Sequence, residues 1–239
     1  MKRNEFLKTL GVGTIIFPVI SSCMKDNSIL SEPGTDNGSN GDCEITNAET
    51  AGPFPTKDPS SLERLDIRGD RTGILLDVEM IILNKGNDCL PLEGAIVDIW
   101  HCDKDGYYSE YGGTNMQRND YSAVHFLRGR QVSDENGVVK YKTIFPGWYQ
   151  GRATHIHVHI YNSSGKSLLV TQVAFPEGDN SAVALVNASS ENGYTKGLNG
   201  YTYNSKDNVF SDGVANELAV LSGSINEGYG LTHSIVVNG

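Results

Sequence analysis

The chain has few basic residues and few long apolar runs. It contains 19 Lys and Arg against 29 Asp and Glu, which gives a formal net charge of -10 at pH 7. A chain of this sign repels nucleic acid and anionic lipid, so we expect no nucleic-acid partner. The apolar run at residues 10–20 is too short to span a bilayer comfortably. Any contact with a membrane must therefore come from an attached lipid.

The first residues have the pattern of an export signal. Met1-Lys2-Arg3 is basic, an apolar run follows, and Ile20-Ser21-Ser22-Cys23 resembles a bacterial lipoprotein cleavage site. We therefore predict a signal peptide at residues 1–22 and a lipid anchor on Cys23. The chain would then be an exported, membrane-anchored lipoprotein that faces the periplasm or is displayed at the cell surface. The start also faintly resembles a twin-arginine export signal, but the second arginine is missing.

A polar segment separates this signal from the rest of the chain. Residues 23–42 are rich in Ser, Gly, Asn and Asp, a composition typical of a flexible tether. Residues 43–239 are predicted to form one domain. Removal of the signal takes away three basic residues and one acidic residue, so the formal charge becomes 16 minus 28, or -12. The mature chain is therefore more acidic than the precursor.

Cysteines are scarce, with four in 239 residues. After lipidation of Cys23, three remain, which permits one disulfide and one free thiol in an oxidising compartment. We favour Cys43 with Cys89, because Cys43 lies at the domain edge and Cys89 lies in a polar loop, whereas Cys102 follows a strand of buried character. A pair between Cys89 and Cys102 is the alternative.

Short apolar runs separated by turns indicate an all-β fold. The 27 glycines and many Asn and Asp residues bound runs that are rich in valine, isoleucine and tyrosine. We predict a β-sandwich of mainly antiparallel strands with long loops and little helix. One helix is expected at residues 212–221, from apolar residues at helical spacing. The predicted strands lie at residues 75–83, 95–100, 138–144, 155–160, 168–175 and 234–237.

Three alternating histidines are the strongest chemical signal. On a strand, His155, His157 and His159 share one face, and two imidazoles spaced in this way can converge on one metal ion. Such a stripe can also simply face solvent. Two tyrosine-bearing segments flank the histidines, Tyr107-Tyr108 upstream and Trp148-Tyr149 beside them, and phenolate with imidazole favours ferric iron over metals that prefer thiolate. The pattern points to a non-haem Fe(III) centre.

At this point the sequence resembles the intradiol ring-cleavage dioxygenases, the family of the catechol 1,2- and protocatechuate 3,4-dioxygenases. The resemblance extends over blocks that follow one another in family order from about residue 43 to 180. The blocks are Glu49-Thr50-Ala51-Gly52-Pro53-Phe54, Asp66-Ile67-Arg68, residues 92–101, Gly106-Tyr107-Tyr108-Ser109, residues 127–134, Pro146-Gly147-Trp148-Tyr149, residues 152–157 and Thr171-Gln172.

The resemblance implies a role for each matching residue. It makes Tyr108, Tyr149, His155 and His157 the iron ligands, and it leaves His159 outside the set. Tyr149 matches the tyrosine that the substrate displaces and that accepts a substrate proton. Arg152 matches an arginine that stabilises negative charge on the ring, and Gln172 matches a glutamine of the same wall. The family usually reads Arg-Pro-Ala-His, whereas this chain reads Arg152-Ala153-Thr154-His155, so the rigidity that proline gives is absent.

The function implied is cleavage of a catechol-type ring by O2 between the two hydroxyl-bearing carbons, which yields a muconate-type dicarboxylic acid. Catechol, protocatechuate and hydroxyquinol all satisfy the ligand set. The helical region that dimerises the catechol enzymes is missing, so the resemblance predicts no oligomeric state. One alternative is a non-catalytic lipoprotein that binds aromatic compounds or metal. Another is a zinc or copper site of His155, His157 and His159.

Other aromatic residues near these motifs have simpler structural interpretations. We expect Tyr107, Trp100 and Trp148 to serve in packing. His101 and His125 are expected to make local hydrogen bonds.

Overall fold

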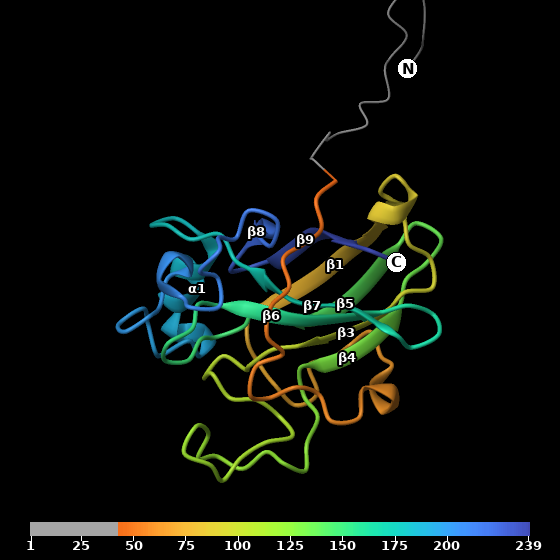
Figure 1. Cartoon of the computed structure of the whole chain (residues 1–239). Helices are drawn as coiled ribbons and strands as arrows, with labels where there is room; N and C mark the ends of the chain where they lie inside the picture. Colours follow the sequence, from red (N-terminus) through yellow and green to blue (C-terminus); the bar gives the residue numbers. More distant parts are fainter. Residues whose placement is uncertain (1–42) are drawn as a thin grey trace, which may run out of the picture. The chain divides into compact units, whose positions relative to one another are not determined.

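Residues 43–239 are the part of the chain that the computed structural model describes, and in them two sheets face each other (Figure 1). The first sheet has the order β4-β3-β6-β7, and the second has the order β2-β1-β9-β8, with β5 also paired to β1. Of these pairs, β1 and β9 run parallel and the others antiparallel. The predicted β-sandwich is confirmed. The bounds are β1 Leu75–Asn84, β2 Leu90–Pro91, β3 Ile96–Trp100, β4 Arg128–Val132, β5 Val138–Ile144, β6 His155–Tyr161, β7 Ser167–Ala174, β8 Val220–Ser224 and β9 Gly228–Val237.

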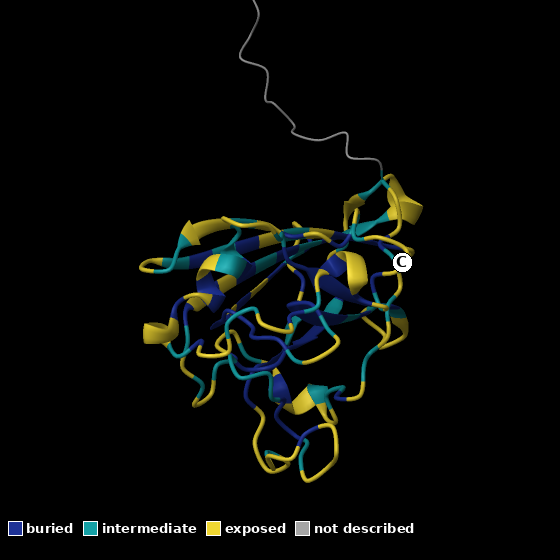
Figure 2. Cartoon of the chain, turned by 90° about the vertical axis from the view of Figure 1, so that its left-hand side faces the viewer, coloured by how far each residue is buried: buried dark blue, intermediate teal, exposed yellow. Residues whose placement is uncertain are grey.

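The core lies between the inner faces of the two sheets. Alternate residues of β1, from Leu76 to Ile82, and of β6, from Ile156 to Ile160, are buried in one apolar cluster. Because side chains alternate along a strand, the histidines of β6 point to the other face of the first sheet. Burial follows this plan in Figure 2, where buried residues concentrate in the strands and exposed residues in the outer loops.

Every predicted strand is present. β5 begins and ends where predicted, β9 begins earlier than expected, and the others agree closely. The strands β2, β4 and β8 were not predicted, and β2 is only two residues long. β4 contains Arg128 and Arg130, and β8 contains two serines and Gly223, so neither has the apolar run from which strands were inferred. Their backbones pair with β3 and β9 all the same.

The helix predicted at residues 212–221 is wrong. Gly213 has a φ of 98°, and the residues after it form turns that lead into β8. The Ala219 N–H donates to the Ala174 carbonyl, and the Ala174 N–H donates to the Glu217 carbonyl, so this segment continues the edge of β7. Its apolar residues alternate, since Val220 is exposed and Ala219 is buried. Tertiary pairing with the sheet thus overrides the helical spacing.

Helix is as limited as expected. The α-helix α1 spans Ala182–Asn187, and Ser181 caps it by accepting a hydrogen bond from the Ala184 N–H. Short 3-10 turns lie at Pro59–Leu62, Lys85–Asn87, Ser190–Asn192 and Asn204–Lys206. Within residues 43–239, none of the helices has the length and apolar character that crossing a membrane requires.

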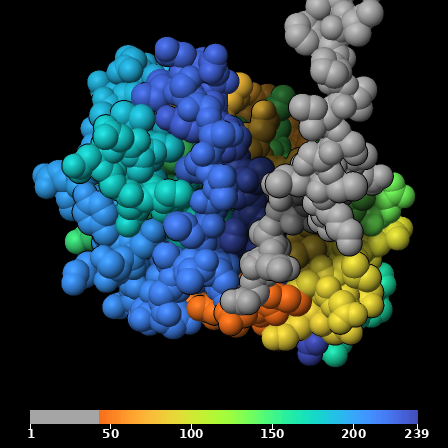
Figure 3. All heavy atoms as spheres, turned by 90° about the horizontal axis from the view of Figure 1, so that it is seen from above, coloured from red at the N-terminus to blue at the C-terminus, as the bar shows by residue number. Residues whose placement is uncertain are grey.

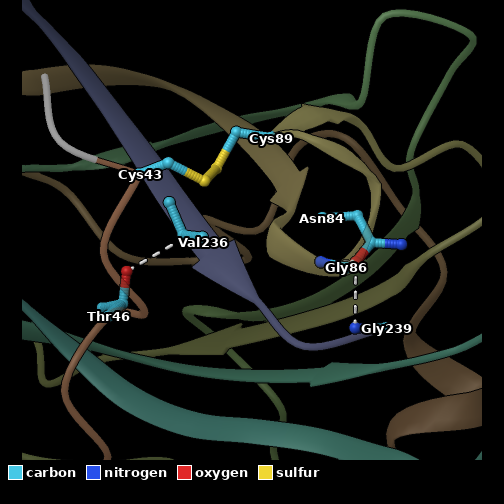
Figure 4. Close-up of a disulfide and its surroundings, with 7 residues drawn as sticks. All are labelled: Cys43, Thr46, Asn84, Gly86, Cys89, Val236 and Gly239. Carbon is cyan, nitrogen blue, oxygen red and sulfur yellow. Dashed lines mark hydrogen bonds between the residues drawn. A yellow bond between two sulfur atoms is a disulfide. The ribbon is translucent and has the colours of Figure 1, made fainter. Parts of the chain in front are cut away.

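The N-terminal arm, residues 43–58, is fixed to the sandwich from its first residue (Figure 4). Cys43 and Cys89 form a disulfide with Cα atoms 6.0 Å apart, which confirms the preferred pairing, and Cys102 is free and buried. The Thr46 and Val236 backbones are also joined, since the Thr46 N–H donates to the Val236 carbonyl at 3.0 Å. The predicted signal peptide and tether at residues 1–42 lie outside the described residues.

Loss of the disulfide is expected to destabilise the domain. In a Cys43→Ala Cys89→Ala variant, the free energy of unfolding should fall by about 2–4 kcal/mol, because the cross-link restricts the unfolded chain over a sequence separation of 46 residues. Denaturant unfolding measures this change. Reductant should lower the unfolding midpoint of the parent and leave that of the variant unchanged. Equal midpoints for parent and variant without reductant would contradict the expectation.

Candidate metal centre

The donor face of β6 lies beneath loops rather than in solvent. His155 and His157 are 2% and 1% exposed. Strand register places Trp100 of β3 and Gln172 of β7 on either side of His157. Tyr108 comes from the loop after β3, and Tyr149 from the loop before β6. The sandwich therefore presents two strand residues to two loop residues at one buried point.

The structure brings the four predicted ligands together. The Nε2 atoms of His155 and His157 are 3.2 Å apart, and the Tyr108 Oη is 3.3 Å from the His155 Nε2. The Tyr149 ring lies edge-on to both neighbours, with its centroid 5.8 Å from that of Tyr108 and 5.7 Å from that of His155. Two phenols and two imidazoles thus converge from three segments of the chain.

The two histidines are held in the correct orientation by different means. The His155 Nδ1 lies 2.6 Å from the Ala153 carbonyl oxygen, which can only accept, so Nδ1 carries the proton and Nε2 keeps its lone pair. The His157 ring stacks on Trp100 with centroids 4.9 Å apart and an interplanar angle of 3°. Gly52 also lies against the ring, where a Cβ atom would approach the His157 Cε1 to 3.0 Å. Because Gly52 has no side chain, the His157 ring can occupy this space.

Burial sets the protonation of this cluster. It lowers the pKa of both His155 and His157 well below the ordinary value, so both imidazoles are neutral, the form that binds metal. Burial also raises the pKa of both Tyr108 and Tyr149, although the charge of Arg152 opposes the rise for Tyr149. A metal ion reverses this effect, because it stabilises the phenolate that coordinates it. The donor set of hard oxygen and imidazole nitrogen fits ferric iron.

Arg152 is fixed beside the cluster by a chain of hydrogen bonds. Its Nε donates to the Asp207 carboxylate at 2.9 Å, and its Nη2 donates to the Gln172 Oε1 at 2.6 Å. The Gln172 Nε2 in turn donates to the Thr50 carbonyl at 2.8 Å. The predicted pair of Arg152 and Gln172 is therefore in direct contact, and both residues depend on segments far away in the sequence.

Asp207 also replaces the rigidity of the missing proline. The Ala153 N–H donates to the Asp207 Oδ2 at 2.8 Å, a bond that a proline at this position could not make. Asp207 is 2% exposed and accepts from Arg152 as well. No motif of the sequence points to Asp207, which follows a short polar turn.

Arg128 is a second supporting residue of the site that the sequence did not single out. It is fully buried, and it donates to the Phe54 carbonyl at 2.9 Å and to the Ser109 carbonyl at 2.7 Å. Phe54 packs on the Tyr108 ring with centroids 5.0 Å apart. Arg128 thus joins the arm to the loop that carries Tyr108. Arg128 lies within residues 127–134, one of the blocks that resemble the family. No feature of the sequence, however, indicates that this arginine is buried or what it contacts.

His159 lies apart from the other two histidines. Its ring nitrogens are each 2.8 Å from a hydroxyl, that of Ser167 and that of Tyr161. It therefore has local partners at the rim of the sheet, and the geometry gives no support to a site of three histidines.

The structural interpretations of the remaining aromatic residues are confirmed. Trp100 and Trp148 are buried, and the Trp148 Nε1 donates to the Gly197 carbonyl at 2.9 Å. The His101 Nε2 lies 2.7 Å from the Thr143 Oγ1, and the His125 Nδ1 lies 2.8 Å from the Glu110 carboxylate. Tyr107 packs near Tyr121.

Comparison with known proteins identifies the family. A family model described as Dioxygenase matches residues 55–206, well over half of the chain. The chain belongs to the intradiol ring-cleavage dioxygenase family. An intradiol ring-cleavage dioxygenase from Tetranychus urticae has a similar structure, with a TM-score of 0.71, 28% sequence identity, and a match that covers 82% of this chain and 95% of that one.

Curated relatives extend the comparison to catechol enzymes. A chlorocatechol 1,2-dioxygenase of Rhodococcus opacus is 30% identical over 150 residues, which are 53% of this chain and 52% of the relative. A catechol 1,2-dioxygenase of Acinetobacter baylyi is 28% identical over 128 residues, 46% of this chain and 39% of the relative. The chain spans about half the length of the curated relatives that it matches, or less.

A methyl group at Gly52 is expected to disturb the metal centre. Gly52 has a φ of 68°, and the added Cβ of Gly52→Ala would press on the His157 ring. We expect iron affinity to fall about 10–100-fold, as when a residue that orients a ligand is lost. Iron content per chain, measured after equilibration with limiting iron, tests this.

Gly165→Ala is the matched control. Gly165 has a φ of 83° and nothing within 4 Å of an added Cβ, so the two variants share the backbone strain but not the contact with His157. Equal iron content in the two variants would contradict the role assigned to Gly52.

Proposed function

We propose that this chain is a non-haem Fe(III)-dependent intradiol dioxygenase. It would cleave a catechol-type ring with O2 between the two hydroxyl-bearing carbons and form a muconate-type dicarboxylic acid. The observation that carries the proposal is the convergence of Tyr108, Tyr149, His155 and His157 at one buried point, with Arg152 held close by. Family membership and the names of the catechol-cleaving relatives support the same reaction.

The two tyrosines differ in a way that suits different roles. Bound by the four donors, ferric iron would draw electron density from a chelated catechol and make its ring reactive toward O2. Tyr108 is 1% exposed, whereas Tyr149 is only partly buried. A substrate that enters from solvent therefore meets Tyr149 first. Tyr149 is the ligand that can leave and take a proton from a catechol hydroxyl.

Arg152 is placed to stabilise the charge that develops on the substrate. Its guanidinium is permanently charged and is oriented by Asp207 on one side and Gln172 on the other. A donor that is already oriented costs no reorganisation when the negative charge appears. The surrounding Phe54, Trp100 and Tyr108 form an apolar cluster that limits access of water.

We also propose that the chain is exported as a lipoprotein anchored through Cys23 and faces the periplasm or the cell surface. The support is the order of a basic start, an apolar run and a small-residue segment that ends in cysteine. The strongly acidic chain agrees with membrane contact through the lipid alone.

Visible absorption tests the proposed reaction most directly. The iron-loaded protein should show a broad tyrosinate-to-Fe(III) charge-transfer band, and the band should shift when a catechol is added without oxygen. Tyr149→Phe should alter the band and reduce catechol-dependent oxygen uptake about 10²-fold or more, because a ligand and a proton acceptor are lost together.

His159→Ala is the control for the alternative site of three histidines. We expect it to keep the band and its oxygen uptake, since His159 bonds to Ser167 and Tyr161 instead. A colourless protein after reconstitution with iron would refute the iron site. Loss of metal in His159→Ala, with Tyr149→Phe unaffected, would favour the alternative.

Cys23→Ala is expected to move the expressed full-length chain from the membrane fraction to the soluble fraction, because the lipid has no acceptor. Ser28→Ala, in the predicted tether, should leave the distribution unchanged. Fractionation and immunoblotting measure both variants. Membrane association that survives Cys23→Ala would contradict the anchor.

A further inference from the structure

Three carboxylates gather on the edge of the sandwich, away from the four donors of the metal centre. Glu49, Asp212 and Glu217 each offer an oxygen, and these oxygens lie within 4.8 Å of one another. Glu49 belongs to the N-terminal arm, whereas the other two belong to the segment of residues 207–219. Figure 3 shows the start of the arm in orange against late residues in blue. The cluster therefore lies where two distant parts of the chain meet.

No positive side chain neutralises this cluster within residues 43–239. None of the three carboxylates takes part in a salt bridge there. The charge of Arg152 acts on Glu49, but the Arg152 guanidinium is bonded to Asp207 and Gln172 instead. The Asn47 Nδ2 donates to the Asp212 Oδ2 at 3.0 Å, which satisfies one oxygen of that residue. Among residues 43–239, the remaining negative charge has no cationic side chain bonded to it.

The lack of a compensating partner is most pronounced at Glu217. Its side chain is fully buried, and its Oε2 has no hydrogen-bond partner in the described residues. Its Oε1 lies 3.2 Å from the Thr171 Oγ1, but that hydroxyl is also 2.7 Å from the Asn47 carbonyl oxygen. A hydroxyl has one proton, and the carbonyl can only accept, so the shorter bond takes the proton. Glu217 is then a buried carboxylate without a donor, and such a group requires a proton or a cation.

The acidities of the cluster agree with this conclusion. Burial, followed by the charge of Glu49, raises the pKa of Glu217 to about 8. Burial and the charge of Asp212 also raise the pKa of Glu49. A proton on Glu217 is therefore the natural competitor of a cation at this place.

We propose that Glu49, Asp212 and Glu217 form a binding site for a divalent cation of the Ca²⁺ type. Carboxylate oxygens are the ligands that hard cations prefer. With bonds of about 2.3–2.6 Å, opposite oxygens on Ca²⁺ can be about 4.6–5.2 Å apart, whereas the shorter bonds of Mg²⁺ limit them to about 4.0–4.2 Å. The three carboxylate oxygens lie within 4.8 Å of one another, a spacing that the long and flexible bonds of Ca²⁺ accommodate. Asp212 is exposed, which leaves room for water to complete the coordination.

The site would join the two segments that hold the active-site wall. On the arm, Thr50 follows Glu49 and accepts from Gln172. On the other segment, Asp207 holds Arg152. A cation shared by Glu49 and Asp212 therefore fixes the supports of Arg152 and Gln172 with respect to each other. Binding is a property of this cluster alone and does not require the proposed dioxygenase reaction.

Calcium titration of the full chain, loaded with iron and freed of other divalent ions, tests the site. Calorimetry should show one Ca²⁺ per chain with a dissociation constant of about 10⁻⁴–10⁻³ M, and weaker binding of Mg²⁺. Saturating Ca²⁺ should raise the thermal unfolding midpoint by several degrees, because the ion binds the folded state.

Glu217→Gln and Glu44→Gln form a matched pair of variants. Both remove one negative charge, but Glu44 is exposed and lies outside the cluster. Glu217→Gln resembles the protonated residue in shape, so it should fold and keep its iron, yet its Ca²⁺ affinity should fall at least about tenfold. Glu44→Gln should bind as the parent does. Absence of saturable Ca²⁺ binding in the parent, or equal affinity in both variants, would overturn the proposal and leave the proton as the occupant.

Discussion

The two-sided character of β6 is the constraint on which the rest of the structure depends. Ile156, Val158 and Ile160 fill the core between the sheets, and this fixes His155 and His157 on the opposite face. A slip of one residue in register would bury the histidines between the sheets and expose the core residues, so the hydrophobic pattern specifies the position of the donors. The pairing of β6 with β3 and β7 then determines which residues flank them.

The donor face of the first sheet is covered by other parts of the chain. The cover here is the arm, with Gly52 against His157 and Phe54 against Tyr108, together with the loop between β3 and β4. Arg128 bonds to both parts, and the disulfide at Cys43 fixes the start of the arm. The burial that results keeps the imidazoles neutral. The same burial makes the phenols poor acids, and a bound metal ion would stabilise their phenolates and so complete the charge of the proposed site.

Sequence reasoning succeeded where a local pattern carries the information. Apolar runs between turns predicted β5 and β6, alternation placed His155 and His157 on one face, and the resemblance to the dioxygenase family selected Tyr108 and Tyr149 as their partners. It failed where contacts between distant parts of the chain determine the local structure or the role of a residue. Residues 212–221 have helical spacing, but their backbone pairs with Ala174 at the end of β7. Asp207 and Arg128 act through bonds to residues more than fifty positions away, and no spacing rule reports such contacts.

The replacement of the usual proline by Ala153 shows how local sequence and tertiary contacts are connected. Proline restricts the backbone by itself, through its ring. Ala153 has no such restriction, and its N–H is fixed by the Asp207 carboxylate, which also binds Arg152. The orientation of Arg152 in this chain therefore depends on the position of residues 207–219, and so on whatever holds that segment to the arm. A local source of rigidity has been exchanged for a tertiary one. Protonation or cation binding at the proposed Glu49, Asp212 and Glu217 site would therefore act on the wall of the proposed active site, although none of these three residues is a predicted iron ligand.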